Sequence, residues 1–228
     1  MTETMTGATT AGARKLIFDL DGTLVDSAPD LATALNALLA EMGAPALSLQ
    51  AIRAMIGDGA GVLVARGLAA SGLQEAAEAE TLPAALKRFL ALYRDCLIDQ
   101  TRAYPEVEAT LERLLARGHQ LGVCTNKPID PTRRILAALG LERFFGAVIG
   151  GDSLAKRKPD PEPLLAAIAG LGGTAKAVMI GDSANDMLCA RAAAVPSILI
   201  PSDYGNPAED ADVKLASFAE LPEAIARL

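Results

Sequence analysis

The sequence contains no tryptophan, only three tyrosines and five phenylalanines, and a single histidine among its 228 residues. It also has no run of about 18 apolar residues, so no membrane-spanning helix is expected. Basic residues are in deficit, because 21 Lys and Arg stand against 28 Asp and Glu and give a net charge of -7. Since affinity for nucleic acid comes mainly from clustered Lys and Arg, we expect no nucleic-acid partner.

Cysteine is scarce as well. Cys96, Cys124 and Cys189 are odd in number, widely spaced and flanked by apolar residues, which predicts reduced, buried thiols in place of a disulfide framework.

Residues 1–13 are mostly Thr, Gly and Ala, with no apolar segment of the kind found in a secretory signal. We therefore expect a flexible tail over 1–13 and a cytoplasmic protein.

Short apolar segments recur along the chain, and Gly, Pro or an acidic turn lies close to each one. They cover residues 15–18, 121–124, 147–149, 177–180 and 197–200. Helical patterns lie between them at 107–117, 131–139, 161–169 and 184–194. This alternation predicts an α/β fold with a doubly wound parallel sheet, a Rossmann-like core formed by residues 14–26 and 104–228.

The alternation stops over residues 27–103, where Ala and Leu recur at helical spacing without a convincing strand. Gly57, Gly59 and Gly61 interrupt this segment. We predict an inserted α-helical cap domain here. Because the insertion follows the first strand directly, the cap should lie over the carboxyl ends of the strands, where ligands of such sheets bind.

Polar residues follow four of the predicted strands. Each group alone has an ordinary explanation: a helix cap, a Thr/Asn turn, a basic surface loop or the acidic first turn of a helix. Together they supply carboxylates, neutral donors, a cation and carboxylates again at one edge of the sheet, which independent turns would rarely produce. The residues are Asp19, Asp21 and Gly22, then Thr125 and Asn126, then Lys158, and finally Asp182 and Asp186.

A metal ion is expected among these carboxylates. Asp19, Asp21 and Asp182 would repel one another if they were brought together without a cation. A set of oxygen ligands favours Mg²⁺ over zinc. The backbone at Gly22 can approach a ligand closely, and the Thr125 hydroxyl and Asn126 amide are neutral donors suited to phosphate oxygens.

With these motifs in this order, the sequence resembles the haloacid-dehalogenase-like phosphatase superfamily over nearly the whole chain after the tail. The stretches that carry the resemblance are Asp19-Leu20-Asp21-Gly22-Thr23-Leu24-Val25-Asp26-Ser27, Gly150-Gly151-Asp152-Ser153 with Lys158-Pro159, and Gly181-Asp182-Ser183. They are most similar to those of bacterial phosphoglycolate phosphatases. The presence of Asp21 favours phosphoryl transfer over dehalogenation.

The resemblance implies a role for each site residue. It implies that Asp19 is the nucleophile, Asp21 the general acid and base, Thr125 a phosphate ligand, and Lys158 the cation that balances the phosphoryl group. For Mg²⁺ it implies the side chain of Asp19, the backbone carbonyl of Asp21 and the carboxylate of Asp182 as ligands. Asp186 would bind the ion directly or contact a residue that does.

The expected substrate is 2-phosphoglycolate or a similarly small phosphate ester. Arg53 is the candidate partner for a substrate carboxylate, and the loop 57–61 should line the chamber under the cap. An equally plain interpretation makes Arg53 an exposed helical residue and the glycines a connection between helices. The resemblance leaves open a monomer or a homodimer.

The motifs also fit other functions. A phosphosugar phosphatase or a phosphoglucomutase-type transferase of the same superfamily would also keep Asp21 and a helical cap. A phospho-accepting signalling domain is the alternative outside the enzymes. It fits less well, because in the receiver family the acceptor Asp and the acidic pair lie on different strands, whereas Asp19 and Asp21 share one strand end.

Overall fold

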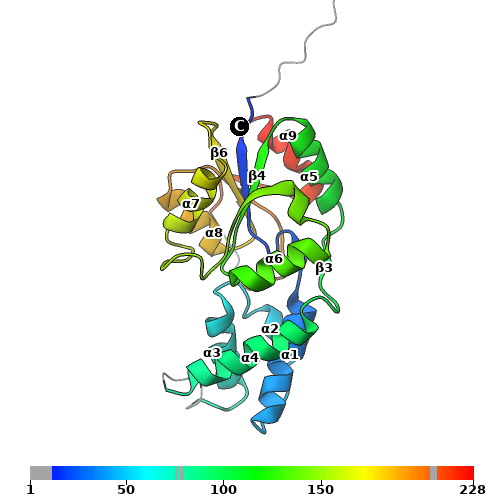
Figure 1. The fold of residues 1–228 in the computed structure, drawn as a ribbon, viewed down its shortest axis with the longest axis vertical. Coiled ribbons are helices and arrows are strands. Elements are labelled where there is room, and N and C mark those ends of the chain that lie inside the picture. The colour runs from blue at the N-terminus through cyan, green and yellow to red at the C-terminus, as the bar shows by residue number, and fades with distance from the viewer. Residues whose placement is uncertain (1–11, 75–76, 78–79, 206–209) are drawn as a thin grey trace, which may run out of the picture.

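The computed structural model describes residues 12–74, 77, 80–205 and 210–228. Most of the predicted tail, residues 1–11, lies outside these ranges. Figure 1 shows an α/β part that carries the chain's C-terminus and, below it, a separate group of helices. The predicted α/β fold class is confirmed.

A six-stranded parallel sheet forms the centre of the α/β part, in the order β5-β4-β1-β6-β7-β8. Its strands are β1 (Lys15–Phe18), β4 (Gln120–Cys124), β5 (Phe145–Ile149), β6 (Ala177–Gly181), β7 (Ser197–Leu199) and β8 (Val213–Lys214). Every predicted strand is present. The two-residue β8 was not predicted, because it has no apolar run of its own.

Burial on both faces explains why β1 reads as a continuous apolar run. Phe18 points to one face, where its ring lies 6.2 Å from that of Phe145 and 6.0 Å from that of Phe218. Ile17 points to the other face and packs in a cluster with Leu164 and Cys189. The central strand is therefore fixed by helices on both sides.

The helices that cover the sheet are α5 (Val107–Ala116), α6 (Ile129–Ala138), α7 (Glu162–Gly170), α8 (Ala184–Ala192) and α9 (Leu221–Ile225). In Figure 1, α7 and α8 lie on one side of the sheet, and α5 and α9 lie on the other. Helix α6 begins two residues earlier than predicted, because Pro128 is extended and supplies the N-cap. Short 3-10 turns occur at Glu142–Phe144 (η2) and Phe218–Glu220 (η3).

Among the described residues, four α-helices form the lower part: α1 (Ala28–Glu41), α2 (Leu49–Arg53), α3 (Ala60–Ala70) and α4 (Leu82–Cys96). Leu35 of α1 and Phe89 of α4 are fully buried in one apolar cluster. A Cβ at Gly67 would come within 2.8 Å of the Leu35 side chain, so this glycine lets α3 approach α1. The insertion is helical, as the periodicity predicts.

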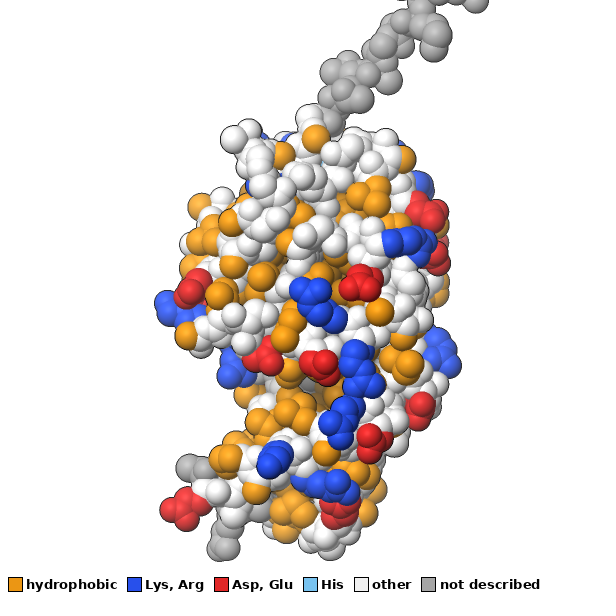
Figure 2. All heavy atoms as spheres, in the orientation of Figure 1, with side chains coloured by type: hydrophobic (Ala, Val, Ile, Leu, Met, Phe, Trp, Pro, Cys, Tyr) orange, Lys and Arg blue, Asp and Glu red, His pale blue; other side chains and the backbone are white. Residues whose placement is uncertain are grey.

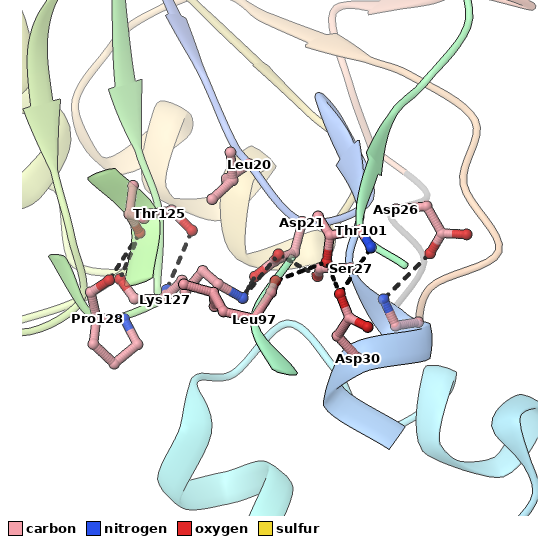
Figure 3. Close-up of polar contacts among 12 residues, drawn as sticks. Leu20, Asp21, Asp26, Ser27, Asp30, Leu97, Thr101, Thr125, Lys127 and Pro128 are labelled. Atoms are coloured by element: carbon pink, nitrogen blue, oxygen red, sulfur yellow. Dashed lines mark hydrogen bonds and ion pairs between the residues drawn. The ribbon is translucent and has the colours of Figure 1, made fainter. Parts of the chain in front are cut away.

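The chain crosses between the two parts on a pair of short antiparallel strands, β2 (Val25–Asp26) and β3 (Arg102–Ala103). The predicted boundaries at 27 and 103 fall at this pair and stay a prediction. The buried Asp30 carboxylate of α1 links the two crossing segments. It accepts hydrogen bonds from the Thr101 amide at 2.8 Å and from the Thr101 hydroxyl at 2.7 Å (Figure 3).

The surface and the thiols can be compared with what the composition predicts. On the described part of the face seen in Figure 2, acidic side chains lie beside a series of basic ones that runs from the α/β part down onto the lower helices. Among the described helices, none is both long and apolar enough to span a bilayer. All three cysteines are free; Cys124 and Cys189 are buried as predicted, whereas Cys96 is half-buried.

Candidate active site

Asp19 stands where β1 ends. Its amide donates to the Ile180 carbonyl at 2.9 Å, which continues the pairing of β1 with β6 and fixes the backbone. Its Oδ1 accepts a hydrogen bond from the Leu20 amide at 2.7 Å and lies 2.9 Å from Lys158 Nζ. The side chain is 10% exposed, and these contacts hold the carboxylate in one orientation at the carboxyl edge of the sheet.

Three carboxylates meet at this edge. Asp19, Asp182 and Asp186 each offer an oxygen within 4.8 Å of the others. Burial, with the charge of Asp186 added, raises the pKa of Asp19 to about 7 although Lys158 opposes the shift. Burial and the charges of Asp19 and Asp186 likewise raise the pKa of Asp182 well above its usual range. Without a further cation these groups are crowded by like charge.

Glycine makes this crowding sterically possible. Gly22 has a φ of 89°, and a Cβ there would overlap the Asp182 carboxylate. Thr23 donates from its hydroxyl to Asp182 Oδ1 at 2.7 Å. The loop after β1 therefore packs directly on the loop after β6, and Gly22 serves this close approach.

Lys158 lies between two of the carboxylates. Its Nζ is 2.6 Å from Asp186 Oδ1 and 2.9 Å from Asp19 Oδ1, and the side chain is buried. Burial disfavours the ammonium, but the charges of Asp186 and Asp19 outweigh burial and raise the pKa of Lys158 above its usual range. Nearby Lys156 is exposed and pairs with Asp160 instead. Of these two lysines, only Lys158 points into the site.

Asp186 occupies the first turn of α8. Its Oδ2 accepts from the amide of Ser183 at 3.1 Å and from the hydroxyl at 2.6 Å, while Oδ1 binds Lys158. Both oxygens already have protein partners. Asp186 thus anchors Lys158 to the start of the helix.

Asp21 faces a second lysine. The Asp21 carboxylate accepts from the Ser27 hydroxyl at 2.5 Å, and its two oxygens lie 3.1 and 3.2 Å from Lys127 Nζ (Figure 3). Lys127 is buried, and its ammonium lies 4.8 Å from the centre of the Tyr93 ring of α4. The sequence places Lys127 after a strand, but nothing in it shows that this charge turns inward.

Thr125 and Asn126 differ in what their side chains do. The Thr125 hydroxyl accepts from the Lys127 amide at 3.2 Å, so its own hydrogen can point elsewhere. The Asn126 amide donates to the carbonyls of Gly57 and Lys158, both at 3.1 Å. Its two donor hydrogens are thereby used, and Asn126 ties the cap loop to the Lys158 loop. The expected contact of Asn126 with phosphate stays a prediction.

A cavity of about 40 Å³ lies between the sheet edge and the cap helices. The α/β part supplies Asp19, Asp21, Thr125, Asn126, Lys127, Pro128 and Pro131, and the inserted helices supply Leu31, Ile56, Gly57, Gly59, Ala60, Leu63, Phe89, Leu90 and Tyr93. We call this space the chamber. Gly57 and Gly59 line it, as expected for the glycine loop.

Arg53 forms an ion pair within the protein. Its Nη2 is 3.0 Å from Asp26 Oδ2, and its guanidinium lies 5.4 Å from the centre of the Tyr204 ring. It is not among the described residues that line the chamber. In this structure the guanidinium is paired with Asp26 of β2, and the expected contact of Arg53 with a substrate carboxylate stays a prediction.

Known proteins share this architecture. Residues 16–200 match the model of the haloacid dehalogenase-like hydrolase family. A phosphoglycolate phosphatase of Rhodospirillum rubrum is 48% identical over 196 residues, 85% of this chain and 81% of the relative. One of Caulobacter vibrioides is 44% identical over 213 residues, 92% of this chain and 89% of the relative.

Solved structures agree. A structure described as a predicted phosphoglycolate phosphatase of Haemophilus somnus superposes with a TM-score of 0.85 at 32% identity, over 96% of this chain and 99% of that one. Fold, strand-end residues and sequence similarity coincide over the same part of the chain. The resemblance read from the motifs is therefore confirmed, and the chain belongs to the haloacid dehalogenase-like hydrolase family.

Proposed function

We propose that this protein is a Mg²⁺-dependent phosphatase that hydrolyses 2-phosphoglycolate to glycolate and phosphate through an aspartyl-phosphate on Asp19. The observation that carries the proposal is the Asp19 carboxylate at the end of β1, bound to Lys158 and lining the same chamber as Asp21. The relatives named phosphoglycolate phosphatases, with 44–48% identity over most of the chain, support the choice of substrate.

The residues present suit Mg²⁺. Four carboxylates, those of Asp19, Asp21, Asp182 and Asp186, stand against the two ammonium groups of Lys127 and Lys158, so one divalent cation would balance the remaining charge. All donors are oxygens, which Mg²⁺ prefers. We assign Asp19, Asp182 and the Asp21 backbone carbonyl as ligands. Asp186 has both oxygens engaged and is better suited to holding Lys158.

In the first half-reaction, Asp19 attacks phosphorus. The bond from its free carboxylate oxygen to phosphorus forms while the ester oxygen leaves with the bonding electrons. When bound by these residues, Mg²⁺ would offset the repulsion between the carboxylate and the phosphate dianion. Lys158 supplies a fixed positive charge beside the attacking carboxylate, and the Thr125 hydroxyl donates to a phosphate oxygen.

Asp21 acts first as the general acid and then as the general base. In its protonated form it gives a proton to the departing alkoxide, and as a carboxylate it then takes one from the water that attacks the aspartyl-phosphate. The second step breaks the bond between phosphorus and Asp19 and restores both side chains. Ser27 and Lys127 hold the Asp21 carboxylate at the chamber wall, where a leaving group would lie.

The phosphosugar alternatives remain within the same family. The relatives named phosphoglycolate phosphatases favour the two-carbon ester over a hexose phosphate. Release of inorganic phosphate should be measured with 2-phosphoglycolate, several hexose monophosphates and an aryl phosphate, each with and without EDTA. We expect 2-phosphoglycolate to give the highest kcat/KM and EDTA to abolish turnover; a preference for hexose phosphates would move the protein to another branch.

A further inference from the structure

Lys127 is a buried charge that holds the Asp21 carboxylate and has no contact with substrate assigned to it above. Its side chain is 4% exposed, and it is the one cation among the described residues that line the chamber. Lys158 is bound to Asp19 and Asp186, and Arg53 is bound to Asp26. A negative group on a leaving group would therefore find its partner at Lys127.

Resting on the proposed function, we propose that Lys127 and Tyr93 together bind the carboxylate of the leaving group and set the preference for an acidic two-carbon ester. Lys127 belongs to the segment after β4, and Tyr93 comes from α4 of the cap. The site would thus be assembled from both sides of the chamber. The chemistry it recognises is a carboxylate a short distance from the scissile phosphate.

The ammonium can accommodate such a ligand. Burial disfavours the charged form of Lys127, but the charge of Asp21 outweighs burial and keeps the pKa of Lys127 above its usual value. An ammonium has three donor hydrogens, whereas the described hydrogen bonds of Nζ go to the two oxygens of one carboxylate. The third donor faces Tyr93, so an acceptor that enters between Lys127 and Tyr93 can bind both.

The hydroxyl of Tyr93 lacks an acceptor for its hydrogen. The residue is 3% exposed, and the hydroxyl lies beside the Lys127 ammonium, which can donate to it but cannot accept from it. A buried hydroxyl that donates to nothing is unfavourable, so an acceptor is expected there. Burial raises the pKa of Tyr93 to about 12, which keeps the hydroxyl protonated and able to donate.

The surroundings favour a short, charged leaving group. The chamber wall around Tyr93 is apolar. Ile56, Leu63 and Phe89 belong to the same apolar cluster as Tyr93 and line the same cavity. In such surroundings a contact between an ammonium and a carboxylate is stronger than in water. A carboxylate on Lys127 would also share the charge that Asp21 alone neutralises in the present structure.

The test compares two substrates of equal length, 2-phosphoglycolate and ethyl phosphate, which lacks the carboxylate. Their kcat/KM values should be measured for the wild type and for Lys127→Met, Lys127→Arg and Tyr93→Phe. We expect Lys127→Met to lower the preference for phosphoglycolate by about 30- to 100-fold, and Tyr93→Phe by about fivefold. Lys127→Arg should recover part of the preference, since it keeps the charge.

Substitutions of Lys127 also disturb Asp21 and so affect both substrates. The decisive quantity is therefore the ratio of kcat/KM for 2-phosphoglycolate to kcat/KM for ethyl phosphate. Inhibition by the product glycolate gives a second readout that needs no turnover of phosphoglycolate, and it should weaken in Lys127→Met. If Lys127→Met does not fold, Lys127→Gln carries the same comparison. Proportional losses on both substrates with unchanged glycolate inhibition would overturn this inference alone, whereas a wild type without preference for phosphoglycolate would overturn the proposed function.

Discussion

The two walls of the chamber are built on different principles. The sheet edge presents charges fixed by short polar contacts, as with Asp19 and Lys158 at 2.9 Å. The cap wall presents apolar side chains such as Leu63 and Phe89, which packing alone holds in place. The sheet edge is suited to stabilising charge during bond making, and the cap wall to excluding water and limiting the size of the ester.

Few polar contacts join the two walls. The Asn185 amide donates to Asp58 Oδ1 at 2.6 Å, the Asn126 amide reaches the Gly57 carbonyl, and Lys127 lies over Tyr93. All three start from the α/β part and end on the cap. The difference between the charged sheet edge and the apolar cap wall predicts two kinds of effect. Substitutions on the sheet edge should change rates with little loss of stability, whereas those on the cap wall should change stability and selectivity.

The largest effect is expected for Asp19→Asn. The amide keeps the volume of the side chain but is no nucleophile, so kcat should fall by about 10⁴-fold or more. The midpoint of thermal unfolding should not fall, because the substitution relieves like-charge crowding with Asp186. Steady-state kinetics with a calorimetric control would check both parts, and substantial residual activity would contradict covalent catalysis.

Lys158→Ala should come next, with kcat lower by about 10³-fold, because a buried cation beside the attacking carboxylate is lost. Lys156→Ala is the matched control on the same loop. Its exposed side chain pairs only with Asp160, so its activity should stay within about twofold of wild type. Equal losses in both variants would show that the loop acts as a diffuse basic patch.

Asp182→Asn is expected to act on the metal. It removes one anionic ligand from the proposed site, so the Mg²⁺ concentration for half-maximal activity should rise by about tenfold or more. Titrating activity with Mg²⁺ measures this directly. An unchanged Mg²⁺ requirement would remove Asp182 from the site.

On the cap wall, Phe89→Ala should lower the free energy of unfolding by about 3–5 kcal/mol, because the ring is fully buried in the cap cluster. The substitution should also enlarge the chamber, so that kcat/KM for larger phosphate esters rises relative to kcat/KM for phosphoglycolate. Leu165→Ala is the control, since that side chain is 48% exposed on α7 and should cost less than about 0.5 kcal/mol. Denaturant unfolding gives both values.

The smallest effect is expected for Arg53→Met. Its ion pair with Asp26 is partly exposed, at 18% and 29%, and it lies outside the lining of the chamber. The ratio of phosphoglycolate to ethyl phosphate turnover should stay within about twofold of wild type. A selective loss on phosphoglycolate would return Arg53 to the substrate site and weaken the case for Lys127.

The sequence predicts most of the sheet edge, because strand ends are local features. An apolar run such as residues 15–18 marks a buried strand, and Asp19 and Asp21 follow it directly. The topology then brings the residues after β1, β4 and β6 together, since parallel strands end at one edge. These placements needed no knowledge of side-chain packing.

The cap contacts could not be predicted in the same way. Lys127 and Tyr93 are far apart in sequence, and only the closure of α4 over the sheet edge brings the ammonium onto the ring. Arg53 carries the right charge to bind a carboxylate, but it forms an ion pair with Asp26 of β2, which lies nearby in the fold. Asn126 has suitable donors, which the cap loop and the Lys158 loop use instead.

The central claim is that the sheet edge transfers the phosphoryl group to Asp19. The most direct measurement uses Asp21→Asn with Mg²⁺ and an aryl phosphate, whose leaving group needs little protonation, so that the intermediate forms but its hydrolysis is slow. After acid quench, peptide mass spectrometry should find one added phosphoryl group on Asp19, and none in the variant that also carries Asp19→Asn. Consumption of substrate without a phosphorylated Asp19, or with the group on another residue, would contradict the account.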